Sequence, residues 1–133
     1  MGMVTLAVGA AEWLTDTRRT VLTFWGVHLV TLVGESLLIA LPVYQRWGVQ
    51  GGAVMSDRDV GPSAGYFGCL GLACNRLPQP WRWLSGSAVL VGLIITLFGD
   101  GIRTVTRPGK NWTVKLFADL AHLIAFPLGW LTA

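Results

Sequence analysis

Apolar residues along the chain form long runs that are separated by short polar segments. Three of these runs, at about 20–44, 82–99 and 112–131, are long enough to cross the ~30 Å hydrocarbon core of a bilayer as helices. The centre of the second run carries no charge, whereas the other two contain ionisable residues. The pattern predicts an all-α integral membrane protein with three transmembrane helices.

Two shorter apolar segments do not fit a simple span. Residues 3–14 are too short to cross a bilayer, and we expect them to form a short interfacial helix near the N-terminus. The glycine-rich segment 60–76 carries no charge before Arg76, and at about 1.5 Å per residue it nearly crosses the core. We interpret this segment as a re-entrant or surface segment, with a fourth span as the alternative. Residues 1–133 are interpreted as a single membrane domain.

The composition supports a lipid environment. Hydrophobic residues make up 53% of the chain, charged residues only 13%, and the mean hydropathy is +0.56. A soluble domain carries about 25% charged residues, so this chain has too few charges to solvate a water-facing surface. The net charge is +3, but the basic residues are spread through the connecting segments, which argues against nucleic-acid binding. We expect Arg103, Arg107 and Lys110 to contact lipid head groups.

Tryptophan and basic residues predict an orientation. Trp and Tyr favour the two membrane interfaces, and Lys and Arg favour the inner side. In a three-span chain Trp13 would lie at the inner interface and Trp130 at the outer one. The N-terminus would then lie inside, the C-terminus outside, and the first and third spans would run in the same direction.

Small residues recur on one face of two predicted spans. Ala88, Gly92 and Thr96 are four residues apart in the second predicted span. The corresponding small residues of the last predicted span are Ala118, Ala125 and Gly129. Small residues allow helix backbones to approach closely in lipid. We expect the Gly92 face to be a close helix contact, either within this chain or, as we favour, with a partner subunit.

The ionisable residues deepest in the predicted spans are His28, Glu35, Asp119 and His122. An ionisable residue at bilayer depth costs about 2.5–3.5 kcal/mol, so each should face a partner or a cavity. We expect Glu35 and Asp119 to be buried, where they either fix helix register through hydrogen bonds or form a proton path. His28 and His122 are expected at a similar depth. They are the candidate ligands of a b-type haem if the chain binds a cofactor; otherwise no cofactor and no metal are expected.

The two cysteines, Cys69 and Cys74, do not have the spacing of a zinc or redox site. On a helix they would point about 140° apart, because each residue turns by about 100°. Two packed free thiols are therefore expected, and a disulfide would require a non-helical loop.

The function classes are narrowed by what the sequence lacks. It has no nucleophile–base set, phosphate-binding loop or metal-ligand cluster, so we do not expect an enzyme. We expect a small accessory subunit of a respiratory or photosynthetic type of complex, in a bacterial, mitochondrial or plastid inner membrane. Its partners would be membrane lipid and other integral membrane subunits. One alternative is a cytochrome b-type anchor for haem or quinone, similar in length and span count to the membrane anchors of succinate dehydrogenase. Another is a small transporter or channel with Glu35 in its pathway.

Overall fold

The protein is mostly helical in the regions that the computed structural model describes, which are residues 2–42, 44–46, 61–106 and 112–133. The expectation of an all-α chain is confirmed for these residues. In chain order the elements are α1 (Gly2–Leu14), α2 (Thr17–Glu35), the π-helical turn η1 (Ser36–Ala40), α4 (Ser63–Arg76), α5 (Trp81–Thr106) and α6 (Trp112–Leu131).

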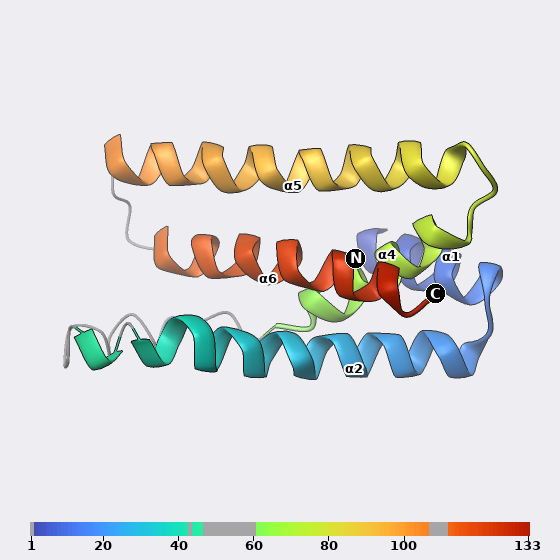
Figure 1. The fold of residues 1–133 in the computed structure, drawn as a ribbon, viewed down its shortest axis with the longest axis horizontal. Helices are drawn as coiled ribbons and strands as arrows, with labels where there is room; N and C mark the ends of the chain where they lie inside the picture. Colours follow the sequence, from blue (N-terminus) through green and yellow to red (C-terminus); the bar gives the residue numbers. More distant parts are fainter. Residues whose placement is uncertain (1, 43, 47–60, 107–111) are drawn as a thin grey trace.

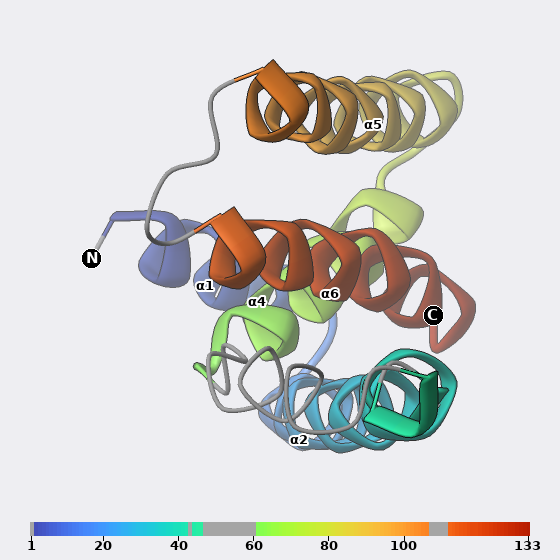
Figure 2. The same cartoon turned by 90° about the vertical axis from the view of Figure 1, so that its left-hand side faces the viewer.

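Three long helices, α2, α5 and α6, lie side by side, with α6 between the other two (Figure 1). The shorter helices α1 and α4 pack beside them at one end, as the end-on view also shows (Figure 2). This end holds the turn between α1 and α2, the link between α4 and α5, and the C-terminus. We call it the tryptophan end, because Trp13, Trp81, Trp83 and Trp130 all lie there.

Helix α4 forms the centre of the packing. Nine of its 14 residues are buried, among them Gly65, Gly68 and Gly71. A Cβ atom on Gly65 would lie 2.8 Å from the Phe24 ring of α2, and one on Gly68 would lie 2.8 Å from Val27 Cβ. Helix α4 is therefore packed against its neighbours within the chain, and whether the segment 60–76 is re-entrant, on the membrane surface or a fourth span stays a prediction. At about 1.5 Å per residue, α4 is roughly 21 Å long.

Because α4 is a helix that the three-span prediction left out, the helices after it run in the opposite direction to the one predicted. Helices α2 and α5 both run away from the tryptophan end, whereas α4 and α6 return to it (Figure 1). The first and last predicted spans, α2 and α6, are therefore antiparallel, and the prediction that they run in the same direction was wrong. Trp13 and Trp130 share one end for the same reason. The three-span topology did not include α4 as a helix that returns to the tryptophan end.

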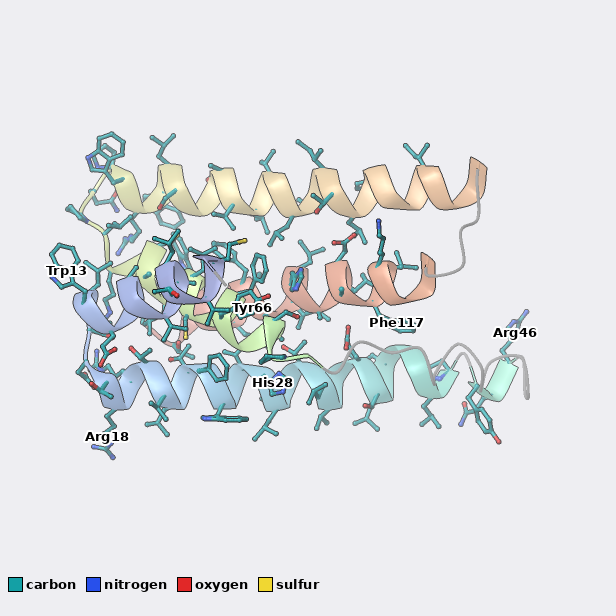
Figure 3. The ribbon with its side chains drawn as sticks, turned by 180° about the vertical axis from the view of Figure 1, so that it is seen from behind. Trp13, Arg18, His28, Arg46, Tyr66 and Phe117 are labelled. Atoms are coloured by element: carbon teal, nitrogen blue, oxygen red, sulfur yellow. The ribbon has the colours of Figure 1, made fainter. Side chains whose placement is uncertain are left out.

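Basic residues do not separate the two ends of the bundle. Arg18 and Arg76 lie at the tryptophan end. Arg46 lies at the opposite end from Trp13 and Arg18 (Figure 3). Because both ends carry arginine, the loop charges do not fix an orientation in the membrane.

Helix α1 packs onto α4 through its small residues. Ala11 is fully buried in a cluster with Cys69, Leu72 and Ala73 of α4. The two-residue turn after α1 ends at Asp16, whose carboxylate accepts a hydrogen bond from the Arg19 backbone N–H at 2.8 Å and so caps α2. Large apolar side chains of α1 remain exposed. The predicted position of this helix at a membrane interface stays a prediction.

Two helices in the described residues are long and apolar enough to cross a membrane: Thr17–Leu38 and Trp81–Gly99. Only 28% and 11% of their most apolar windows are buried, whereas the core helix of a soluble protein is mostly buried. A third span is not confirmed, although residues 112–131 do form α6 as a helix.

The distribution of side chains on α2 also favours lipid. Its buried residues are polar apart from one valine, and they are Thr20, Thr23, Val27, His28, Thr31 and Glu35. Its exposed face carries large apolar side chains, among them Val21, Leu22, Trp25, Leu29, Val30 and Val33. A helix on the surface of a soluble protein has the reverse arrangement, with its apolar stripe inward. The two candidate spans and this reversed pattern together indicate a membrane location.

Candidate functional site

The buried polar side chains of α2 lie along its inner face in two groups. Thr20 and Thr23 are three residues apart, and His28, Thr31 and Glu35 follow one another at three and four residues, with the buried Val27 between the two groups. His28 is 8% exposed, and Thr31 and Glu35 are each 1% exposed. We call Thr20, Thr23, His28, Thr31 and Glu35 the polar row.

Near the tryptophan end, polar contacts join three helices. The hydroxyl groups of Thr23 in α2 and Thr132 after α6 are 3.1 Å apart. Asn75 of α4 donates through Nδ2 to the Trp130 carbonyl of α6 at 2.7 Å. The Cys69 thiol is 3.8 Å from the Thr20 carbonyl, as a weak donor. These contacts hold the ends of α2, α4 and α6 together, which supports a register-fixing role for this part of the row.

The middle of the polar row carries unsatisfied polar atoms. Among the described residues, His28 Nδ1 and Thr31 Oγ1 are buried without a hydrogen-bond partner. A buried polar group without a partner costs about 1–3 kcal/mol, so such groups in a native protein require an explanation. A bound water molecule or another polar group in this space would satisfy both atoms.

The two histidines lie on antiparallel helices. At about 1.5 Å per residue, His28 is roughly 16 Å from the start of α2, and His122 is roughly 14 Å from the end of α6. Both distances are measured from the tryptophan end, so helix lengths alone still give a similar depth. The ring of Phe67 in α4 stacks on His122, with centroids 4.1 Å apart and planes at 24°. Trp25 meets His28 edge-on at 6.1 Å. The haem alternative stays a prediction.

Glu35 is the last α-helical residue before the helix widens. The next residues, Ser36–Ala40, form the π-helical turn η1, and the Ser36 hydroxyl donates to the Leu32 carbonyl at 2.6 Å. Pro42 follows this turn and has no N–H to donate back along the helix. Turns of this kind are frequent at functional sites. Glu35 faces the interior and is therefore kept away from lipid, while Asp119 of α6 is half-buried.

The two predicted small-residue faces differ in their surroundings. In α6, Ala125 and Gly129 are buried, and a Cβ atom on Gly129 would collide with the Gly68 backbone of α4. Ala118 is half-buried. In α5, a Cβ atom on Gly92 would meet nothing within 4 Å in the described part of the chain. Ala88 and Thr96 are also exposed. The α5 face therefore makes no close contact within these residues, and its contact with a partner subunit stays a prediction.

The remaining predicted residues can be placed only in part. Arg107 and Lys110 lie outside the described residues, and Arg103 is at the far end of α5, where no side chain is described. Their contact with lipid head groups therefore stays a prediction. Cys69 and Cys74 are both buried free thiols on α4.

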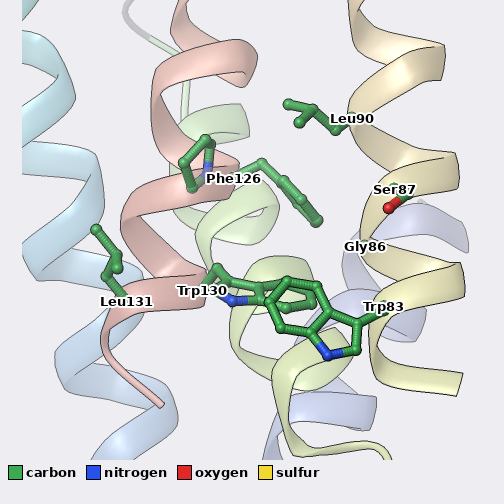
Figure 4. Close-up of a pocket in the computed structure, with 8 residues that line it drawn as sticks. Trp83, Gly86, Ser87, Leu90, Phe126, Trp130 and Leu131 are labelled. Carbon is green, nitrogen blue, oxygen red and sulfur yellow. The ribbon is translucent and has the colours of Figure 1, made fainter. Parts of the chain in front are cut away.

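A pocket of about 280 Å³, which the sequence did not predict, lies between α5 and α6 at the tryptophan end (Figure 4). Gly86 of α5 allows the Trp130 ring to pack closely beside it, because a Cβ atom there would lie 2.6 Å from Cη2 of Trp130. Trp83 also packs against Trp130, with ring centroids 5.6 Å apart. The lining residues are Trp83, Gly86, Ser87, Leu90, Phe126, Pro127, Trp130 and Leu131.

Within the described residues, no group of three or more His, Cys, Asp or Glu side chains is placed to hold a metal ion. Comparison of the chain with protein-family models, with curated proteins and with solved structures found no match.

Proposed function

We propose that this chain is a small non-catalytic accessory subunit of a multi-subunit membrane complex. The observation that carries the proposal is the exposure of α5. Of its residues with described side chains, only Gly86 and Leu93 are buried. The rest of its apolar surface includes Val91, Ile95 and Phe98, which are all exposed. This 26-residue helix is packed along one side. Its other sides are therefore open to lipid and to neighbouring helices.

The open face around Gly92 fits a neighbouring helix better than it fits lipid alone. Helix association in lipid relies on close van der Waals packing, and glycine, alanine and threonine allow the closest approach. Within a complex of the respiratory or photosynthetic type, the role would be structural. The chain would fill the perimeter, bind lipid and hold neighbouring helices in register.

The substitution Gly92→Leu tests this role. The leucine side chain has space in the isolated chain, so the bundle should fold normally. It would separate α5 from a helix packed on that face, so a defined complex isolated in mild detergent should lose this subunit. Native gel mobility and the subunit stoichiometry of the purified complex would measure the loss.

Gly26→Leu on α2 is the matched control, because a Cβ atom on Gly26 also meets nothing within 4 Å of the described residues. This variant should remain in the complex. Equal retention of both variants would contradict a contact at the Gly92 face.

A second candidate function is favoured by the polar row. Buried ionisable residues in membrane helices often mark proton or ion pathways, and His28, Thr31 and Glu35 lie in sequence along one face. Under this alternative the chain is a small transporter or channel with Glu35 in its pathway. Proton flux into liposomes separates this candidate from a structural role.

A further inference from the structure

The pocket between α5 and α6 lies at the tryptophan end of the bundle. Its walls are two tryptophans, a phenylalanine and aliphatic side chains, and tryptophan favours the membrane interface. Ser87 and Trp83 on its rim are both exposed, so the pocket is reached from outside the bundle. An apolar chain entering from the bilayer would meet an almost entirely apolar surface.

A cation lies beside one of the tryptophans that line this pocket. The Arg82 guanidinium carbon is 5.4 Å from the centroid of the Trp83 ring that lines it. With its amide oriented to suit its neighbours, Gln79 accepts hydrogen bonds from Trp83 Nε1 at 2.8 Å and from Arg82 Nη2 at 3.0 Å. These contacts hold the indole and the guanidinium side by side.

The charge of Arg82 is not neutralised by the part of the chain that the structure describes. The ion pair found there joins Arg19 to Asp16 at 3.7 Å, and no carboxylate lies within that range of Arg82. The Arg82 Nε atom is buried and has no hydrogen-bond partner among the described residues. A guanidinium has a planar set of donors that matches phosphate oxygens. Arg82 is therefore a cation beside the pocket that can pair with an anionic group of the pocket's occupant.

We propose that this pocket binds one anionic phospholipid, with an acyl chain between α5 and α6 and its phosphate on Arg82. Anionic head groups are attracted to basic residues at the membrane surface. An apolar helix from a partner protein would fill the pocket but would leave the guanidinium without a counter-charge. The proposal requires a membrane location but no partner subunit, so it can fail or succeed independently of the proposed function.

Native mass spectrometry of the full chain, released from nanodiscs of known composition, would test the proposal. The wild-type chain should retain one phosphatidylglycerol more strongly than phosphatidylcholine. Arg82→Gln should lower retention of phosphatidylglycerol about tenfold, because a hydrogen bond to a charged group is lost. Retention of phosphatidylcholine should not change. Arg76→Gln is the matched control: Arg76 is exposed at the same end, but the ring contact with the pocket tryptophan Trp83 is made by Arg82, so lipid retention should not change.

A second variant tests the acyl-chain part of the site. Ser87→Trp should fill the pocket from its exposed rim and lower retention of both lipids. A photo-reactive amino acid at position 87 should form adducts with phospholipid in intact membranes. Equal phosphatidylglycerol retention by wild type and Arg82→Gln would overturn the proposal, as would adducts at position 87 with a protein only. Arg82→Gln changes charge alone, so it decides the question even if Ser87→Trp misfolds.

Discussion

Gly129→Leu should prevent the helix bundle from assembling, and Gly68→Leu should have the same effect. A Cβ atom on Gly129 would collide with the Gly68 backbone, and one on Gly68 would lie 2.8 Å from Val27 on the other side. Adding one or a few methylenes to a packed core typically costs about 1–3 kcal/mol. Here the obstacle for Gly129 is backbone rather than a rotatable side chain, so we expect a loss above that range. Thermal unfolding in detergent and the elution profile on gel filtration would measure the effect.

The controls are the same substitution at glycines that have space. A Cβ atom on Gly26 or Gly92 meets nothing within 4 Å of the described residues, so Gly26→Leu and Gly92→Leu should unfold within a few degrees of the wild type. If Gly129→Leu were as stable as these two variants, the close contact between α4 and α6 would be wrong.

The helical content of this chain could be predicted from its sequence because apolar runs of sufficient length are a strong signal. The predicted span 112–131 coincides with α6, Trp112–Leu131, and the predicted span 82–99 lies within α5. That signal reports only that a segment prefers helix and an apolar environment. It does not report whether lipid or another helix supplies that environment, so the three spans remain a prediction.

The central position of α4 could not be predicted from apolar length. Its 14 residues are too few for a clear span, and its glycines lower both hydropathy and helix propensity. Their spacing was nevertheless a usable signal, since Gly65, Gly68 and Gly71 recur every three residues and share one side of a helix. A helix with glycine on that side is suited to close contact with other backbones. A helix placed at this segment would also have reversed the predicted direction of α6.

The candidate site could also be predicted only in part. The polar row of α2 was partly predictable, because ionisable residues in a membrane helix should face inward. The pocket was not predictable, because it depends on how α5 is rotated about its axis. Gly86 and Gly92 lie about 120° apart around α5, and only Gly86 meets α6 through Trp130. Sequence spacing identified the Gly92 face, but it did not identify which side of α5 meets α6.

Glu35→Lys should destabilise the protein strongly, whereas Glu35→Gln should leave it folded. Glu35 is 1% exposed and lies about 16 Å along the helix from Arg46, which marks the far end. A lysine stem is too short to carry its ammonium group to that end. A buried charge that has no partner costs about 3–5 kcal/mol of folding free energy. Glutamine keeps the size and hydrogen-bonding capacity of the side chain without a charge.

Glu35→Gln also separates the two candidate functions, because an amide hydrogen-bonds but cannot exchange a proton near neutral pH. If the polar row only fixes helix register, this variant should match the wild type in thermal stability, in assembly and in proton permeability of liposomes. Thr23→Val is a matched control for register alone, because it removes the hydroxyl contact with Thr132 at 3.1 Å and no titratable group. We expect a modest loss of stability from that change and none from Glu35→Gln. A fall in proton flux with Glu35→Gln, while the bundle and its assembly remain intact, would contradict the structural role and assign the row to proton transfer.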